Sequence, residues 1–559
     1  MGDWHFAERR LVCKVVVLQH VLSLKKLLLS YHYAANTLIL FRWISHITIL
    51  GLAVTTENTM LTRTSNQARG LAQYATDFID GAFADPDEAV FAKVEQFNLD
   101  SIGCAVAALA CGMNAPVVLR EEALSYPVSE GKRGVACFGS SIRVSPEKAV
   151  LANCSAVREL DANGTNFGYN PRTGYARGEF GHNDFYPVAL AAAQLAGLNG
   201  RQTVRAMICL DEIRGRLAEV FGLKDHKIDH VVHGAIASAA VYGAVLGATV
   251  DQIESAIGQT VAHYIPFRAI RAGNQLSDSK GASAAISAEV AVMSVHRAMR
   301  GFVGPAGIFR NPQAIFCLFE PPSKPDESPF DLELATTGSD FAVMDMHFKL
   351  GLYEHQSAGA IQGLMDVLEA NPKLLGDANS MKKIRITIYE PAFSIIGDPA
   401  KRDPRTRQSA DHSMVYIVAT LLRKAFESQQ SGWRELMLLP EDYDDQALHN
   451  PLTRLLMEKI EFVHGGPDYD AKYPDGIPTT LQMEHTEIGT FSSGLVMYPV
   501  GHARNTSGKL QELLEYKFQR LASLGVSNVD RLYDRFSVLS SKSSGEIAEI
   551  MDFQIAGMN

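Results

Sequence analysis

Between Asn66 and Ala335, apolar residues recur every three or four positions in windows rich in alanine and leucine. This period places apolar side chains on one face of an α-helix, which has 3.6 residues per turn. The spacing predicts helices over Glu88–Cys111, Pro146–Leu160, Val188–Ala196, Gln202–Phe221, His233–Leu246, Thr249–Tyr264 and Gly281–Met299. We therefore expect a helical first domain, over residues 61–335.

The pattern changes after the turn-rich segment Cys317–Ser339, which contains PPSKPDESP. Lys383–Glu390 alternates apolar and polar residues, as a half-buried strand does. Further strands are expected over Ile477–Ile488 and Ser493–Val500, and helices over Leu350–Ala370 and His412–Glu427. These elements predict an α+β domain over residues 336–500, and residues 501–559, with a helix over Gly508–Leu524, are expected to return to the helical domain.

Residues 1–60 differ from the rest of the chain. No acidic residue occurs between Arg9 and Thr56, and basic residues are scattered among long apolar runs. Three interpretations stay open: a mitochondrial presequence, a membrane anchor over Leu27–Thr56, and an extension that the fold does not need, with Met60 as an alternative start.

Length and charge narrow the function. A chain of 559 residues is too long for one core. The net charge of −10 argues against a general nucleic-acid-binding protein, although an acidic protein can hold a locally cationic pocket for a small anion. Seven cysteines without a C-x-x-C pair indicate reduced thiols in an intracellular compartment and no cluster cofactor.

The segment Arg158–Pro187 concentrates polar side chains in an otherwise alanine-rich chain. It holds Asp161 and Asp184, either of which can orient a base, and His182 after a glycine. Ordering so many polar groups is costly unless a ligand or a reaction uses them. The segment therefore predicts part of a functional site.

Histidines and cations form further candidate sites. His230 and His233 lie one helical turn apart and suit a metal site, a catalytic or substrate-binding histidine, or a structural pair with Asp229 as helix cap. Arg268 and Arg271 precede Lys280 in a Gly/Ser-rich loop before a helix, which suits either anion binding or a solvated basic loop.

Lys349 and His355 lie among apolar residues, where a buried ammonium group needs a partner such as a substrate carboxylate. Arg504 follows a predicted strand, within the short motif GHAR. Phosphate-binding, flavin-binding and G-x-S-x-G motifs are absent from the sequence. Together these groups favour proton transfer beside carboxylates on a small polyanion, without a cofactor or a metal.

Long motifs then identify a family. They include VRELDANGTNFGYNP, GEFGHNDFYPVALAAAQ, KIDHVVHGAIASAAVYGAVLG, LSDSKGASAAISAE, HFKLGLYEHQSA and YPVGHAR, in this order. With them the chain resembles the MmgE/PrpD family, and within it the fungal-type 2-methylcitrate dehydratases. The resemblance implies a large helical domain, a smaller α+β lid domain, a homodimer and a site between the domains. It also implies cofactor-independent dehydration of 2-methylcitrate or, in one branch, decarboxylation of cis-aconitate.

The resemblance carries catalytic roles onto Asp161, His182, His230, Lys280 and Lys349. The pattern DANGTNFGYN around Asn166 resembles the dehydratase branch. Substrate-binding roles are expected for Asn166, Asp184, Arg268, Arg271, His355 and Arg504. In this hypothesis His182 or His230 removes a proton alpha to a carboxylate, Asp161 orients a histidine, and the cations stabilise the developing charge.

Two alternatives to a 2-methylcitrate dehydratase of propionate catabolism stay open. One is a fungal enzyme of secondary metabolism that dehydrates longer alkylcitrates on the way to maleic anhydrides. The other is a non-catalytic partner in a biosynthetic complex. The expected partner is a tricarboxylate, with no nucleic acid, and a membrane only if the N-terminal segment is an anchor. The expected location is mitochondrial, or cytosolic for an enzyme of secondary metabolism.

Overall fold

The helices of the first part of the chain pack around α9 (Val231–Val245), whose residues are all buried. The computed structural model describes residues 58–558 except 130, 167, 171–174, 178–180, 272–274 and 508, and gives the backbone alone at 166, 175, 176, 181 and 182. The expectations for the N-terminal extension therefore fall almost entirely outside the described residues. Helix α9 is apolar on every side, which is typical of a helix enclosed by others.

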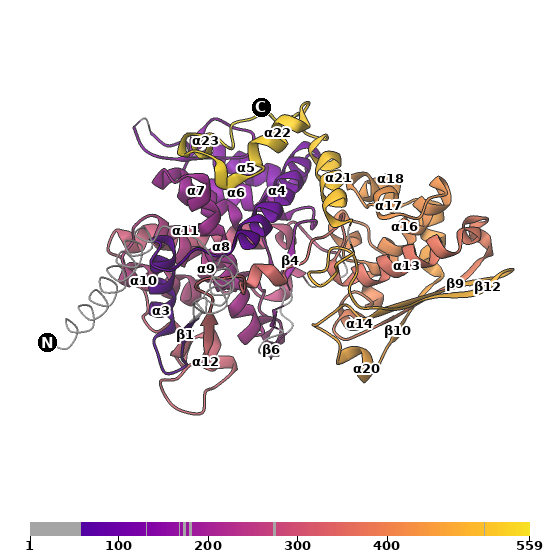
Figure 1. The fold of residues 1–559 in the computed structure, drawn as a ribbon, viewed down its shortest axis with the longest axis horizontal. Helices are drawn as coiled ribbons and strands as arrows, with labels where there is room; N and C mark the ends of the chain where they lie inside the picture. Colours follow the sequence, from indigo (N-terminus) through magenta and orange to yellow (C-terminus); the bar gives the residue numbers. More distant parts are fainter. Residues whose placement is uncertain are drawn as a thin grey trace, which may run out of the picture. The chain divides into compact units, whose positions relative to one another are not determined.

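The helices around α9 confirm the predicted periodicity to within a few residues at each end. Helices α3, α7, α8, α10 and α11 contact it, and α6 packs against α11. Small residues allow this close packing: a Cβ on Gly234 of α9 would lie 2.1 Å from the ring of Phe185. Their bounds are α3 (Gln67–Ile79), α4 (Glu88–Ala110), α5 (Asn114–Leu124), α6 (Pro146–Arg158), α7 (Tyr186–Ala196), α8 (Gly200–Val220), α10 (Val250–His263) and α11 (Ser279–Met299) (Figure 1).

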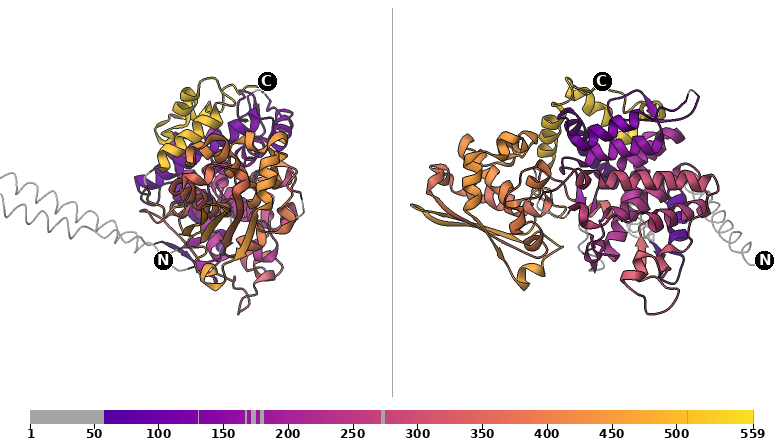
Figure 2. Two further views of the ribbon diagram at one scale, coloured as in Figure 1. Left: turned by 90° about the vertical axis from the view of Figure 1, so that its right-hand side faces the viewer. Right: turned by 180° about the vertical axis from the view of Figure 1, so that it is seen from behind.

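The second part of the chain is built on a four-stranded sheet, in which three strands correspond to the alternating segments and β10 is additional. Its order is β10-β9-β11-β12, with β9 and β10 parallel and the other pairs antiparallel. Helix α13 packs on β11 and β12 (Figure 2). The bounds are α13 (Ala358–Ala370), β9 (Met381–Ile388), α16 (Met414–Ser428), α19 (Pro451–Glu458), β10 (Ile460–His464), β11 (Thr479–His485) and β12 (Gly489–Val496).

The C-terminal helices pack on the helical part. Helix α21 (Leu510–Ala522) and α22 (Val529–Phe536) pack on α4, and α23 (Ser544–Ala548) packs on α7. The fold class is therefore mainly α with an α+β second part.

Strand β10 and the strands before β9 were not expected from the sequence, and one pair of these bears on the predicted domain boundaries. Strand β1 (Thr59–Leu61) pairs antiparallel with β8 (Leu332–Leu334), which lies inside the segment predicted to be a turn-rich linker. Thr59 and Met60 thus belong to the fold, although the predicted extension includes them. Among the described residues no single helix is long and apolar enough to cross a membrane. The helices α4 and α5, which are bent relative to each other, meet the length and composition criteria only when they are taken together.

Candidate active site

Asp161 lies at the centre of a buried cluster of charges. It follows α6 with a φ of 50°, a left-handed conformation that Asp tolerates better than most residues. Nζ of Lys349 donates hydrogen bonds to the backbone oxygen and to Oδ1 of Asp161, and Nζ of Lys280 lies 3.2 Å from Oδ2 of Asp161. Nη1 of Arg158 lies 2.6 Å from Oδ1. Burial opposes ionisation, but the charges of Arg158, Lys349 and Lys280 outweigh it and hold the pKa of Asp161 well below its ordinary value.

A second acid, Asp411, lies beside this cluster and holds His412. It follows α15 (Arg407–Ala410) and accepts hydrogen bonds from Nζ of Lys280 at 2.7 Å and from Nη1 of Arg407 at 2.9 Å. Nδ1 of His412 is 2.6 Å from its Oδ1. Because an ionised carboxylate only accepts hydrogen bonds, Nδ1 carries the proton and Nε2 keeps its lone pair.

The His412 ring is neutral near pH 7. Burial and the nearby Lys280 charge lower the pKa of His412 to about 3. A neutral imidazole held by a carboxylate through Nδ1 is the arrangement that general bases use, because the carboxylate stabilises the imidazolium formed on proton uptake. Asp411 and His412, called the dyad below, therefore form a candidate base.

His412 of the dyad lines an open cavity with an empty volume of about 580 Å³, part of which is open to solvent. Among the described residues, its cationic lining consists of Arg158, Arg268, Arg271, Lys349 and Lys401, and its carboxyl groups are Asp161 and Glu354. The remaining lining residues are Thr165, His230, His355, Gln356, Ile395 and His412. An excess of cations over carboxylates suits a small molecule with several negative charges.

The histidine motif of α9 contributes to this cavity through His230. Asp229 pairs with Arg271, whose Nη2 is 3.2 Å from Oδ1, and it lies 3.6 Å from Nδ1 of His230. Burial lowers the pKa of His230 well below its ordinary value, so this ring is also neutral. His233, one turn on, is buried in the helical core away from the cavity.

The structure brings together most of the residues that the sequence analysis selected. Asp161, His230, Arg268, Arg271, Lys349 and His355 all line the cavity, and Lys280 lies beneath it between Asp161 and Asp411. The side chains of His182 and Asn166 lie outside what the structure describes. Their strands are present: β4 (Thr165–Asn166) pairs with β7 (Gly181–His182).

Asp184 and Arg504 lie away from this cavity. Asp184 is fully buried, accepts a hydrogen bond from Nδ2 of Asn163 at 2.6 Å and faces Arg158, so it supports a lining residue. Arg504 bonds to Asp475, and its guanidinium lies 4.6 Å from the ring centroid of Tyr169.

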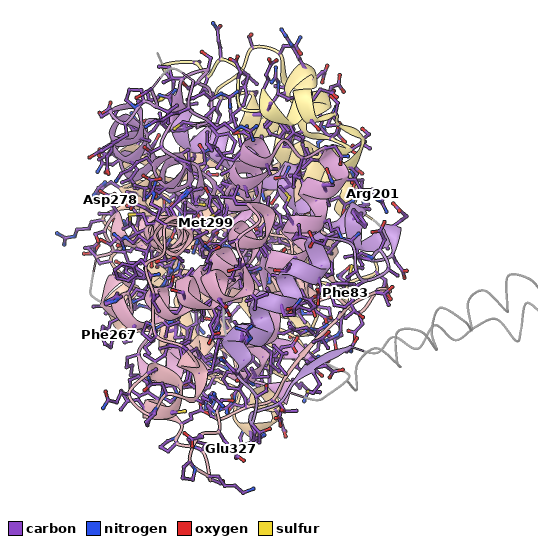
Figure 3. The ribbon with its side chains drawn as sticks, turned by 90° about the vertical axis from the view of Figure 1, so that its left-hand side faces the viewer. Phe83, Arg201, Phe267, Asp278, Met299 and Glu327 are labelled. Carbon is purple, nitrogen blue, oxygen red and sulfur yellow. The ribbon has the colours of Figure 1, made fainter. Side chains whose placement is uncertain are left out.

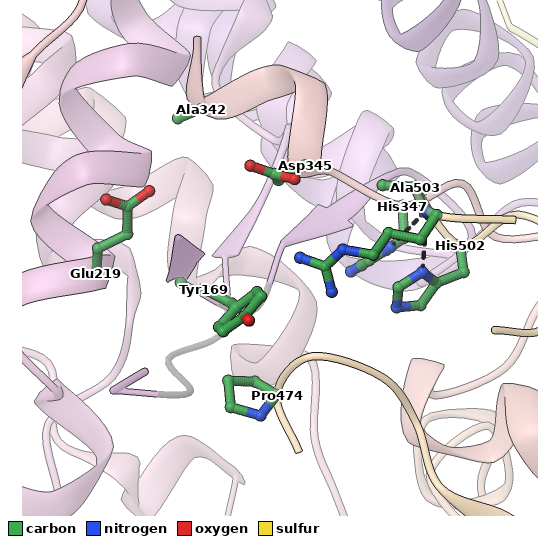
Figure 4. Close-up of a pocket in the computed structure, with 10 residues that line it drawn as sticks. Tyr169, Glu219, Ala342, Asp345, His347, Pro474, His502 and Ala503 are labelled. Carbon is green, nitrogen blue, oxygen red and sulfur yellow. Dashed lines mark hydrogen bonds between the residues drawn. The ribbon is translucent and has the colours of Figure 1, made fainter. Parts of the chain in front are cut away.

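Arg504 lines a second cavity instead, which Figure 4 shows between Tyr169, Glu219 and Asp345. His347 and His502 also border it, and their ring centroids are 4.0 Å apart. His347 in turn stacks on His355 of the first cavity at 5.2 Å. The two cavities are thus neighbours.

Sequence reasoning did not select seven of the lining residues, namely Arg158, Thr165, Glu354, Gln356, Ile395, Lys401 and His412. Glu354 adds a candidate acid, because burial raises its pKa to about 7 and lets it hold a proton near neutrality. The adjacent Asp-His in SADHSM was the one local signal for His412. It has no periodicity or motif length that would separate it from an ordinary loop.

A lysine of the C-terminal helix ties the two loops of the site together. Lys517 of α21 is fully buried and donates from Nζ to the backbone oxygens of Ala162 at 2.5 Å and Lys349 at 2.8 Å. Its charge is balanced by Asp100 of α4 at 2.7 Å. These two hydrogen bonds fix the backbone next to Asp161 and at Lys349, and so hold the two residues in position relative to each other.

Asp161, Asp411 and His412 are the one described group with ligand atoms close enough to share a metal ion, all within 4.8 Å of one another. Their carboxylate oxygens already face Lys280 and Lys349. A metal ion would have to displace these ammonium groups.

Comparisons with known proteins show which family the chain is similar to. The MmgE/PrpD N-terminal domain matches residues 69–328, and the MmgE/PrpD C-terminal domain matches residues 354–537. A 2-methylcitrate dehydratase of Salmonella typhi is 24% identical, over 74% of this chain and 83% of the relative. A mitochondrial 2-methylcitrate dehydratase of Yarrowia lipolytica is 25% identical, over 76% and 78%. An alkylcitrate dehydratase, phiI, of a fungal species is 23% identical, over 78% and 84%.

Proposed function

The chain belongs to the MmgE/PrpD family, and we propose that it is a hydro-lyase that dehydrates a 2-alkylcitrate without a cofactor. The leading substrate is 2-methylcitrate, and the product is 2-methyl-cis-aconitate. The observation that carries the proposal is the cation-lined cavity with a neutral histidine, His412, held at its edge by the ionised Asp411. Relatives named 2-methylcitrate dehydratase support the same chemistry.

The reaction removes a proton alpha to a carboxylate and expels the hydroxyl from the neighbouring carbon. The proton is weakly acidic, because its loss adds negative charge to a group that is already an anion. Cations beside that carboxylate stabilise the charge, and in this proposal Arg268, Arg271 and Lys349, which line the cavity, have this role.

His412 is the base in this proposal and Glu354 the acid. The lone pair on Nε2 of His412 takes the proton, and Asp411 stabilises the resulting imidazolium. Glu354, protonated near neutral pH, gives its proton to the departing hydroxyl, which leaves as water. Asp161 keeps Lys349 and Lys280 paired and in place.

The test compares His412→Asn and His230→Asn with His449→Asn, a control on the exposed segment after α18 (Asp445–Leu448). Turnover is followed by the ultraviolet absorbance of the new double bond. We expect His412→Asn to lower kcat by about 10²- to 10⁴-fold. His230→Asn should raise KM more than it lowers kcat. Normal turnover by His412→Asn would refute the assignment, and loss of kcat in His230→Asn alone would make His230 the base.

The length of the alkyl group is the second question. Ile395, at the end of α14 (Ala392–Ile395), is the one aliphatic side chain among the described lining residues. A single aliphatic side chain in the described lining favours a short alkyl group, whereas the fungal alkylcitrate dehydratase supports a longer one. Measuring kcat/KM for 2-methylcitrate and for a hexylcitrate decides: a preference for hexylcitrate overturns the leading substrate. No turnover of either favours the non-catalytic partner.

We also propose that the protein is a homodimer. Apolar side chains are exposed at the end of α11 and just beyond it, with Phe302 54% and Val303 84% exposed. Figure 3 shows Met299 and Phe267, also exposed, on one face. Covering this surface with a second copy would remove it from water. Light scattering should report a dimer, and Val303→Asp should shift it to a monomer.

For its location we propose the mitochondrion, because a relative is named as a mitochondrial enzyme. Fusion of residues 1–60 to a fluorescent protein tests this. Mitochondrial fluorescence supports the proposal, and cytosolic fluorescence favours the alternative in secondary metabolism.

A further inference from the structure

Gln356 is a fully buried residue of the cavity lining, and its side-chain amide has no hydrogen-bond partner among the described residues. It lies in the short helix η5 (His355–Ser357), where its backbone N–H donates to Oε2 of Glu354 at 2.9 Å. Its side chain is 0% exposed and lines the cavity. Neither Oε1 nor Nε2 has a hydrogen-bond partner among the described residues.

An unpaired buried amide lowers stability, because it has left water without gaining a protein hydrogen bond. Methionine has nearly the same length and no such cost. A glutamine kept at this position is therefore explained by a polar group that arrives with a ligand.

The surroundings of Gln356 indicate which group that is. The five cationic side chains of the cavity supply charge to the carboxylates of a bound tricarboxylate. A neutral amide differs from them, because it donates and accepts at the same time. The matching group on an alkylcitrate is its hydroxyl, which also donates and accepts. Carboxylates only accept.

We propose that Gln356 binds the hydroxyl group of the substrate, the group that leaves in the reaction; this inference rests on the proposed function. The amide orients the carbon–oxygen bond and carries no proton to it. Gln356 is thus a binding residue that separates hydroxylated tricarboxylates from those without a hydroxyl.

The experiment measures the binding of two probes by calorimetry. Citrate carries the hydroxyl, and propane-1,2,3-tricarboxylate is the same molecule without it. We expect Gln356→Met to weaken citrate binding by about tenfold and to change binding of the deoxy probe by less than about twofold. Gln259→Met, which removes a buried amide of α10 that lies outside the cavity lining, should change neither.

A second measurement uses the free protein. Since the amide is unpaired there, Gln356→Met should unfold at the wild-type temperature or above it. A clearly lower midpoint would show that the amide already has a partner and would overturn the inference.

The binding results separate the two proposals. Equal losses for both probes, or no loss for either, overturn the role of Gln356 even if 2-methylcitrate is dehydrated. If the wild-type protein binds citrate about tenfold better than Gln356→Met does but dehydrates no alkylcitrate, the binding role is supported and the proposed reaction is overturned. Failure of the wild-type protein to bind either probe overturns both.

Discussion

Replacing Lys517 by methionine should show how much the site depends on its buried tether. The change removes three donated hydrogen bonds and leaves Asp100 buried without its counter-charge. Breaking a buried ion pair from one side costs about 3–5 kcal/mol, and each carbonyl that loses its donor adds about 1 kcal/mol. A total near 5 kcal/mol corresponds to a fall of about 10 °C in the unfolding midpoint.

The loss should depend on pH with a definite sign. Burial already raises the pKa of Asp100 above its ordinary value, although Lys517 opposes this. Without Lys517 the folded pKa rises further, so the folded state binds the proton more tightly than the unfolded state. Stability then falls as the pH rises from the unfolded pKa, about 3.9, through the folded pKa. The variant should be less destabilised at pH 5 than at pH 8.

A double variant separates stability from positioning. The double variant Asp100→Asn, Lys517→Met has no unpaired buried charge, so its unfolding midpoint should be higher than that of Lys517→Met alone. The carbonyls of Ala162 and Lys349 still lack their donor, so kcat should stay low. Scanning fluorimetry at both pH values and initial rates provide the data. A Lys517→Met midpoint within about 1 °C of wild type at pH 8, or full recovery of kcat in the double variant, would refute the reasoning.

Three further predictions follow from single side chains. The turnover rate should stay constant between the His412 pKa of about 3 and the Glu354 pKa of about 7, and it should fall above pH 7 as Glu354 loses its proton. Glu354→Gln should lower kcat and remove this fall at alkaline pH. An unchanged pH–rate profile in the variant would exclude Glu354 as the acid. Ile395→Ala should improve kcat/KM for hexylcitrate relative to 2-methylcitrate by about 10-fold or more, and an unchanged ratio would remove Ile395 from the alkyl pocket. Gly281→Ala should lower the unfolding midpoint, because its Cβ would lie 2.2 Å from Oε2 of Glu159; a normal midpoint would show that Glu159 can move aside.

The helices and most of the strands could be predicted from the sequence because burial imposes a local period. Helix α11, predicted from Gly281, begins at Ser279 and ends at Met299 as expected. Strands β1 and β8 could not be predicted, since three residues carry no reliable alternation and gain stability only from a partner far along the chain. The parallel strand β10 is similarly short, with five residues.

The residues of the site also divide into those that a local pattern could predict and those that depend on long-range contacts. Asp161, His230 and Lys349 were accessible because long motifs contain them. His412 was not: its partner Asp411 is the preceding residue, but its location beside Asp161, 251 residues earlier, depends on tertiary contacts that no local pattern records. Arg504 stands in an equally noticeable motif, yet the fold places it at the neighbouring cavity. Residue type shows what a side chain can do, and only the tertiary contacts show where it does it.

The contact between Lys517 and Asp100 joins positions 417 residues apart. During synthesis, α4 leaves the ribosome long before α21 is made. The hydrogen bonds of Lys517 to the loops of Asp161 and Lys349 therefore form only when the chain is nearly complete. A chain that stalls or is cut before Lys517 would retain every group that touches the cavity and still lack the alignment that makes them act together. We therefore expect a chain that ends before Lys517 to be inactive, although it contains all the described residues that line the cavity.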